Sequence, residues 1–385
     1  MDKVKQFDHF LTKFKNTEHW KRMQNTVENS PWHREANVAV HTEMVMQKYR
    51  DHFMSHHTEI ENVIALTALL FHDTGKPSAE EVLEKKDGSG DTYRRYAGHE
   101  QDSAVLFQEC YMTMPELRQL LPTYAARAVR WIIEHHLPYG YKDKQKREGL
   151  AIATKVALAE AGASFSLFFD CLRSDAAGRI SDDHEQKLQN VEDWIVQFLT
   201  VNTTPTAIGE GLVMFLLVGP SGSGKSTWTR ERFNPATDVV ISYDDLKMTW
   251  FKQQQSPSAE LLSDEVAFYD AAWAYANENE SEFQKFANGM INTLLDRVKH
   301  ANGTVFIDTV NASKKKRGKF IELAKQKKFR VVAVEFWNSA QTLIDRQKTR
   351  GDKAVPYKSV MQQINAINGV WAGFEADEVW VKVGK

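Results

Sequence analysis

Hydrophobic positions in the first half of the chain recur at three- and four-residue spacing. Residues 62–71, 125–134 and 188–199 show this most clearly, and the spacing is typical of amphipathic helices. No alternating run of β-branched residues interrupts the pattern. The segment 85–96 has Asp87-Gly88-Ser89-Gly90 at its centre and is predicted to be a loop or a hairpin tip. The first half is therefore expected to be an all-α bundle.

The pattern changes after residue 211. Strands that alternate with helices are typical of a parallel sheet covered on both faces. Between the halves, residues 200–211 (TVNTTPTAIGEG) show little periodicity and are predicted to be a linker. We therefore expect a multidomain protein, with an all-α domain at 1–199 and an α/β domain with a parallel sheet at 212–385. The expected strands are 212–218, 239–242, 304–307, 330–336 and 379–383.

Composition narrows the class of protein. The 385 residues are 42% hydrophobic and 26% charged, as in folded globular proteins, and their number suffices for two domains with separate cores. The net charge of −2 predicts no general attraction to nucleic acid, so any such contact would use local basic patches. The charged N-terminus lacks the apolar core of a signal peptide, and the longest apolar run, 212–218, is too short to cross a bilayer. We therefore expect a cytoplasmic protein without membrane contact.

Residues 219–226 read Gly219-Pro-Ser-Gly-Ser-Gly224-Lys225-Ser226. In the pattern GxxxxGK[ST], glycines let successive backbone N–H groups face one anion at a helix N-terminus. Lys225 would reach the β- and γ-phosphates of ATP or another NTP, and the Ser226 hydroxyl would bind Mg²⁺. The residues expected to bind the nucleotide are Gly219, Ser221, Gly222, Ser223, Gly224, Lys225, Ser226 and Thr227.

Two carboxylates follow later strands of the same expected sheet. Asp244 comes after the second strand, where it would lie beside the γ-phosphate and accept the proton of an attacking hydroxyl. Capping of the next helix is the alternative for Asp244 and for Asp245. Asp308 ends the third strand at the same edge. Arg346 and Arg350 are four residues apart on an expected helix ending at residue 351, where they would share a face and neutralise phosphoryl charge.

Four stretches of the second half form a more specific pattern: GPSGSGKSTWTRE, SYDDLK, IDTVN and RQKTRGDKAVP, which spans 346–356. Together they resemble the 5′-hydroxyl polynucleotide kinases of T-even phages and their relatives, over residues 212–365. The last stretch corresponds to the lid of those enzymes and is much more specific than a phosphate loop. Nothing after residue 356 resembles their DxDxT phosphatase module.

The resemblance implies a role for each residue. Asp244 would be the general base and Asp308 an acceptor-site carboxylate, while Arg346 and Arg350 would be lid arginines, with Arg350 also contacting ATP. Where the phage enzyme has an arginine three residues after the base, this chain has Lys247, which loses bidentate phosphate recognition. The residues expected to contact the acceptor are Lys247, Asp308 and Asn311.

Histidines and aspartates follow apolar helices in the first half. The doublet His72-Asp73 comes after 63–71, and His135-His136 comes after 129–133. Histidines at helix ends of a bundle can converge on one interior point. Imidazole and carboxylate together suit Mn, Ni, Co, Fe or Zn, and the sequence does not choose among them.

The first half contains, in this order, His41, His72-Asp73, His99, His135-His136 and Asp175. This ordered set, over residues 30–180, resembles the HD phosphohydrolase superfamily. Its two-metal members would share a bridging aspartate, here Asp73, between ions about 3.5–4 Å apart that activate a water. Lys76 would contact the substrate phosphate. His136 fits the family pattern less well than His135, although it continues the apolar stripe 129–133 better. The metal ligands that the resemblance implies are His41, His72, Asp73, His99, His135 and Asp175.

The lysine-rich run 314–317 and the run 325–330 are local basic segments. Such runs are usually solvated faces, but their position after Asp308 makes contact with a phosphate backbone the alternative. The aromatic residues Trp250, Phe251, Trp273 and Tyr275 are expected in the core, with base stacking as their alternative.

The order of the domains resembles the bifunctional HD–polynucleotide kinase enzymes that heal nucleic-acid ends. That resemblance implies removal of a 2′,3′-cyclic or terminal phosphate by the HD domain and ATP-dependent phosphorylation of a 5′-hydroxyl by the kinase domain. RNA or DNA ends would be the substrate, and an RNA ligase would be the pathway partner. Oligomerisation stays open.

Two other functions remain open. One is a nucleotide phosphohydrolase fused to a nucleoside-type kinase, against which the lid stretch 346–356 argues. The other is a nucleic-acid-binding regulator with a degenerate HD site, against which the full ligand set argues.

Overall fold

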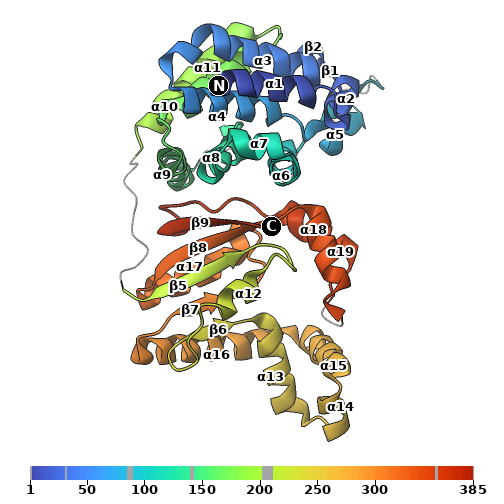
Figure 1. Cartoon of the computed structure of the whole chain (residues 1–385), viewed down its shortest axis with the longest axis vertical. Helices are drawn as coiled ribbons and strands as arrows, with labels where there is room; N and C mark the ends of the chain where they lie inside the picture. The colour runs from blue at the N-terminus through green and yellow to red at the C-terminus, as the bar shows by residue number, and fades with distance from the viewer. Residues whose placement is uncertain are drawn as a thin grey trace. The chain divides into compact units, whose positions relative to one another are not determined.

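The computed structural model describes residues 2–30, 33–84, 90–138, 143–201, 211–351 and 354–384. It divides into two compact units (Figure 1), one of Met1–Pro205 with Trp371–Phe374 and one of Thr206–Val370 with Glu375–Lys385. Most of the predicted linker, residues 202–210, lies outside the described residues. The expected hairpin tip lies partly outside them too, at 85–89.

The first unit is a helical bundle around α4 (Glu59–Phe71). Every residue of α4 from Glu61 onward is buried, which explains why its sequence is apolar on nearly all sides. It contacts α1, α3, α8 and α10. The other helices are α1 (Lys3–Phe14), α2 (Glu18–Asn25), α3 (Val38–His52), α5 (Lys76–Ala79), α6 (His99–Thr113), α7 (Pro115–Leu120), α8 (Thr123–Glu134), α9 (Lys144–Glu160), α10 (Ser166–Ala177) and α11 (His184–Leu199), with a 3₁₀ turn at Met54–His56.

Among the described residues, two short antiparallel hairpins interrupt this bundle. β1 (Val27–Ser30) pairs with β2 (His33–Asn37), and β3 (Glu81–Glu84) pairs with β4 (Thr92–Arg95). Of these two hairpins, the sequence indicated only β3–β4, as a loop or a hairpin tip. These strands are four or five residues long and mostly polar, so they lack the alternating apolar pattern that marks a half-buried strand.

The second unit is built on a five-stranded parallel sheet of order β6-β7-β5-β8-β9. This confirms the α/β fold expected for the second half. β8 is buried at every residue after the first, as parallel strands covered on both faces are. The strands are β5 (Val213–Val218), β6 (Val239–Ile241), β7 (Val305–Ile307), β8 (Arg330–Trp337) and β9 (Glu378–Val383).

Eight helices accompany the sheet in the described part of this unit. Four of them lie between β6 and β7, where Trp250 packs 5.0 Å from Tyr275 and 5.6 Å from Phe283 between ring centroids. Trp250 and Phe251 are buried and form core as expected, whereas Trp273 and Tyr275 are half-buried. The helices are α12 (Lys225–Arg230), α13 (Tyr243–Gln255), α14 (Ala259–Ser263), α15 (Glu265–Glu278), α16 (Glu280–Ala301), α17 (Lys314–Lys327), α18 (Ala340–Lys348) and α19 (Tyr357–Ala366).

The basic run at the start of α17 is not wholly a solvated face, because Arg317 is fully buried. Its guanidinium donates to the carbonyls of Asn311 and Ala312 and forms an ion pair of 3.0 Å with Glu375. Arg317 thereby links the chain after β7 to the segment before β9. Across the described ranges, no helix has the length and apolarity needed to cross a membrane.

Candidate active sites

In the first unit, the two carboxylate oxygens of Asp73 face different pairs of histidines. Oδ2 lies 3.5 Å from Nε2 of His41 and 3.3 Å from Nε2 of His72. Oδ1 lies 3.0 Å from Nε2 of His99 and 3.6 Å from Nε2 of His136. All five side chains are buried. The arrangement forms two adjacent groups of possible metal ligands that share Asp73.

Asp175, on α10, completes the first group. Its Oδ1 lies 3.1 Å from Nε2 of His41 and 3.6 Å from Nε2 of His72. The first group is thus two imidazoles and two carboxylates, and the second is two imidazoles and the shared Asp73. Mixed imidazole and carboxylate donors suit divalent transition ions, whereas Mg²⁺ and Ca²⁺ favour oxygen-only sets. The donor chemistry therefore fits the metals that the sequence indicated.

Backbone carbonyls orient three of these histidines. Nδ1 of His72 lies 2.7 Å from the carbonyl of Leu69, at the end of α4. Nδ1 of His136 lies 2.8 Å from the carbonyl of Ile133, and Nδ1 of His99 lies 2.7 Å from that of Tyr96. A carbonyl only accepts, so Nδ1 carries the proton in each ring. Each Nε2 is thereby directed at the carboxylates and is the ring atom left to bind a metal.

A close backbone approach joins the His72-Asp73 turn to α6. The amide of Gly75 donates to Oγ of Ser103 at 2.8 Å. A Cβ on Gly75 would lie 2.4 Å from the carbonyl oxygen of His99, well inside van der Waals contact. Only glycine lets the turn that carries Asp73 approach the helix that begins with His99.

The structure does not place His135 at the metal site, where the resemblance led us to expect it. His135 is the C-cap residue of α8; its Nδ1 donates to the Trp131 carbonyl at 2.9 Å, and its ring stacks on Trp131 with centroids 4.0 Å apart. The chain leaves the helix at this point, and the next side chain, His136, is the one that reaches Asp73. We therefore correct the expected ligand from His135 to His136.

Charges around the site keep both carboxylates ionised. Burial would raise the pKa of Asp73, but His72 and Lys76 hold this pKa well below its usual range. For Asp175, Arg179 and the histidines likewise outweigh burial and lower the pKa. The pKa of His72 moves to about 10 because the two aspartates outweigh the opposing effect of burial.

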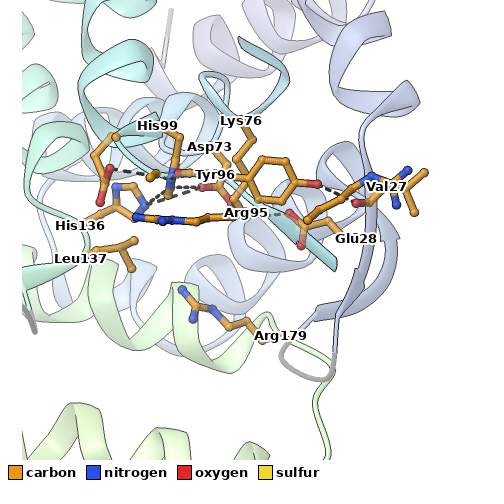
Figure 2. A pocket seen from close by; sticks show the side chains of 14 residues that line it. Val27, Glu28, Asp73, Lys76, Arg95, Tyr96, His99, His136, Leu137 and Arg179 are labelled. Carbon is orange, nitrogen blue, oxygen red and sulfur yellow. Dashed lines mark hydrogen bonds and ion pairs between the residues drawn. The ribbon is translucent and has the colours of Figure 1, made fainter. Parts of the chain in front are cut away.

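A pocket of about 510 Å³ opens beside the second ligand group (Figure 2), between Asp73, His99 and His136. Lys76, predicted to meet the substrate phosphate, lines it with its ammonium 2.8 Å from Oδ2 of Asp73 and 2.7 Å from Glu28. Arg179 also lines it and pairs with Asp175. Sequence reasoning missed Arg179, although its position four residues after Asp175 was a usable signal.

In the second unit, the phosphate loop joins β5 to α12. Gly222 and Gly224 have φ of +83° and +100°, a region that favours glycine. Nζ of Lys225 donates to the carbonyls of Gly219 and Pro220 at 2.8 and 2.9 Å. Burial lowers the pKa of Lys225 to about 8, although Asp308 acts against it.

The far side of the loop is held by α18 and α19. Arg346 donates to the carbonyl of Gly222 at 3.0 Å, and Gln347 donates to that of Ser221 at 3.0 Å. The Ser221 amide donates to Oε1 of Gln363 at 2.7 Å. Since α18 ends at Lys348, the helix expected to reach residue 351 is shorter. Arg350 follows it and contacts Gln347 at 3.4 Å, so Arg346 and Arg350 do not share a helical face.

The expected acceptor residues have different environments. Oγ of Ser226 donates to Oδ2 of Asp308 at 2.7 Å. Asp244 lies in the first turn of α13, whose N-cap is Ser242, so neither Asp244 nor Asp245 is the cap. The ammonium of Lys247 lies 2.9 Å from the ring centroid of Trp273, and burial lowers its pKa.

Asn311 is not placed to contact an acceptor. It is 2% exposed, and its Nδ2 donates to the carbonyls of Leu217 and Ile307 at 2.8 and 3.3 Å. Its φ of +47° is one that asparagine adopts more readily than most residues. We therefore correct its expected role from substrate contact to holding the ends of β5 and β7 together.

Comparison with protein families agrees with these two sites. Residues 38–159 match the HD domain family, and residues 214–370 match the AAA domain family AAA_33. The chain combines an HD domain with a P-loop kinase-like domain. No curated protein matches the chain.

The HD match contains His41, His72, Asp73, His99 and His136. Asp175 lies beyond the matched range, and α10 brings it into the same site. The AAA match contains the phosphate loop, both carboxylates and both arginines of the second site. The domains thus provide two sites for phosphate chemistry, a metal-dependent hydrolase centre and a nucleotide site.

Proposed function

We propose that this protein heals broken nucleic-acid ends, with RNA as the substrate. The HD domain would open a 2′,3′-cyclic phosphate with one water and hydrolyse the resulting terminal phosphate with a second, which releases inorganic phosphate. The kinase domain would phosphorylate a 5′-hydroxyl with ATP. The observation that carries the proposal is that one chain holds both a carboxylate shared by two imidazole pairs and a phosphate loop. A chain that both removes and adds phosphate is suited to converting both ends of a break into ligatable ends.

In the HD domain, the first group (His41, His72, Asp175) and the second group (His99, His136) would hold divalent ions on either side of Asp73. Such ions supply an activated water and stabilise negative charge on a phosphate ester. Lys76 and Arg179 line the pocket beside them and would bind the phosphate oxygens. The carbonyl partners of the histidines fix the donor nitrogens, so the site needs little rearrangement.

In the kinase domain, the nucleotide phosphates would replace the loop carbonyls as partners of Lys225. Ser226 would bind the Mg²⁺ ion, and Asp308, which is hydrogen-bonded to Ser226, would act as the acceptor-site carboxylate. Asp244 would accept the proton of the 5′-hydroxyl as its oxygen bonds to the γ-phosphorus and the bond to the β-phosphate oxygen breaks. Arg350 would neutralise charge on the transferred group, while Arg346 would hold the loop through Gly222.

The products would be a 5′-phosphate and a 3′-end free of phosphate. These are the ends that an RNA ligase joins, so a ligase is the partner activity that this chemistry requires.

One gel assay tests the proposal. An RNA with a 5′-hydroxyl and a 2′,3′-cyclic phosphate is incubated with ATP, Mg²⁺ and Mn²⁺ and with the wild type, Lys225→Ala or Asp73→Asn. We expect Lys225→Ala to lose only 5′ phosphorylation and Asp73→Asn to lose only 3′-end hydrolysis. A wild type that ignores both RNA ends but turns over free nucleotides would replace the proposal with a small-molecule function. Binding of RNA without any turnover would favour a regulator.

A further inference from the structure

The β3–β4 hairpin forms part of the wall of the HD pocket. Arg94, Arg95 and Tyr96 line it, together with the two residues that lead into α6. Gly98, with φ of +81°, turns the chain directly into His99. Because Nδ1 of His99 donates to the Tyr96 carbonyl at 2.7 Å, the end of the hairpin is fixed to the metal centre.

Arg95 differs from the other cations that line the pocket. Lys76 is paired with Glu28 and Asp73, Arg94 with Glu80, and Arg179 with Asp175. Arg95 is exposed, and within the part of the chain that the structure describes no carboxylate pairs with it. Its cross-strand neighbour Glu81 forms no ion pair with it either.

The guanidinium of Arg95 is therefore available to a ligand. In Figure 2 its side chain extends along the pocket in the direction of His136. A planar guanidinium offers paired N–H donors that match two oxygens of a phosphate group. Arg95 is therefore suited to bind a second phosphate group, next to the phosphate that would be held at the metal centre.

Tyr93 extends this surface away from the metal centre. It lies two residues before Arg95, and side chains two apart along a strand point to the same face. Two residues span about 6.6 Å, comparable to one nucleotide of an extended strand. Tyr93 is 38% exposed, so part of its side chain is accessible to a nucleic-acid base, and aromatic side chains stack on bases without regard to sequence.

We infer that the β3–β4 hairpin is a strand-binding arm of the HD domain. Arg95 binds the phosphodiester that joins the terminal nucleotide to its 5′ neighbour, and Tyr93 stacks on the base of that neighbour. The inference rests on the proposed 3′-end activity and deepens it, because it makes the substrate of the HD site an oligonucleotide end in preference to a mononucleotide.

The test compares two substrates that share the same reacting group. One is a single-stranded RNA hexamer with a 5′-phosphate, which leaves the kinase no acceptor, and a 2′,3′-cyclic phosphate. The other is adenosine 2′,3′-cyclic phosphate. Steady-state hydrolysis by the full chain with Mn²⁺ is measured for the wild type, Arg95→Ala, Tyr93→Ala and Arg118→Ala. Arg118 is an exposed arginine of α7 outside the pocket lining and serves as the control for loss of one surface charge.

We expect the wild type to prefer the hexamer. Arg95→Ala should lower kcat/KM for the hexamer about tenfold, the loss of one charge-assisted contact, mainly through KM, with a much smaller effect on the mononucleotide. The slope of log kcat/KM against log salt for the hexamer should fall by about 0.7, the value for one single-strand phosphate contact. Tyr93→Ala should lower kcat/KM for the hexamer alone, and Arg118→Ala should change kcat/KM for neither substrate.

The inference would be overturned if the wild type had equal kcat/KM for the two substrates. It would also be overturned if Arg95→Ala lowered kcat/KM equally for both. If the wild type hydrolyses neither, the proposed 3′-end activity fails. The arm is then judged by fluorescence anisotropy with a 5′-labelled hexamer bearing a 3′-phosphate. Weaker binding by Arg95→Ala than by Arg118→Ala keeps the arm as a nucleic-acid site, and equal binding rejects it. Matching thermal midpoints and metal contents establish that the variants are folded.

Discussion

Nε2 of His136 lies 3.6 Å from Oδ1 of Asp73, whereas the ring of its neighbour His135 stacks on Trp131. Two adjacent histidines with similar burial thus have different environments. We expect His136→Ala to reduce the metal bound per chain and to abolish phosphate release, because the second ligand group loses an imidazole.

The matched variant is His135→Ala. It should leave the metal content unchanged and lower thermal stability, because it removes a stacked ring and a hydrogen bond to the end of α8. Inductively coupled plasma mass spectrometry of the two purified variants measures the difference. Equal loss of metal in both would contradict the assignment of His136.

Nucleotide affinity should depend on pH through Lys225. Burial lowers the pKa of this lysine to about 8, and bound phosphates favour its charged form. Affinity for ATP with Mg²⁺ should therefore be constant below pH 8 and fall by up to about tenfold per pH unit above it. Calorimetric titration at pH 9 in buffers of different ionisation enthalpy should show proton uptake.

In this pH range Lys225→Arg should show neither the decline nor the proton uptake, because a guanidinium stays charged. A wild type whose affinity is flat up to pH 9.5 would show that Lys225 is not the titrating group.

The buried pair of Arg317 and Glu375 should be a major determinant of kinase-domain stability. Glu375→Gln leaves the guanidinium buried without its counter-charge, which typically costs about 3–5 kcal/mol. Glu378→Gln is the matched control, because Glu378 forms a partly exposed pair with Arg330, worth about 0–1 kcal/mol. Urea unfolding of both variants measures the difference, and similar midpoints would contradict this role for the buried pair.

Glu61 should stabilise the HD domain in a pH-dependent way. Its carboxylate accepts from the amides of Thr58 and Ser164 at 2.8 and 2.7 Å. Burial would raise the pKa of Glu61, but these hydrogen bonds outweigh it and lower the pKa to about 2. The stabilisation should thus be complete above pH 4.5 and disappear as the pH falls from 4.5 toward 2.

Glu61→Gln should lower the free energy of unfolding by about 1 kcal/mol at pH 7, and its difference from the wild type should narrow below pH 4.5. Glu185→Gln, at an exposed position in the first turn of α11, should change stability little at any pH. A constant difference between wild type and Glu61→Gln down to pH 3 would argue against this account.

The hydrophobic pattern was sufficient to predict the helical first half, the parallel sheet and the strand positions, because buried elements require it. β8 could be read from its apolar residues alone. For the β3–β4 hairpin the sequence indicated only a loop or a hairpin tip at 85–96 and not the two strands, since these strands are mostly exposed and polar. Arg95 was missed for the same reason.

Those parts of the candidate site were predictable in which only a few residue types, such as histidine and aspartate, can bind a metal. The order of His41, His72, Asp73 and Asp175 was enough to name a common site. The choice between His135 and His136 depends on how the chain leaves α8, which is set by tertiary contacts. Asn311 was misread because an amide after a strand can contact substrate or backbone, and only the structure shows the carbonyls of β5 and β7 around it.

The carbonyl partners of His72, His99 and His136 have a consequence for which ion the protein carries. Each donor nitrogen is oriented by the backbone and not by the ion, so the chelate is formed by folding. The relative affinities of such a site for different divalent ions follow the intrinsic affinities of these ions for imidazole and carboxylate. The element recovered with the purified protein should then follow the supply of trace metals in the growth medium, and manganese-, nickel- and zinc-supplemented cultures should yield differently loaded protein from the same gene.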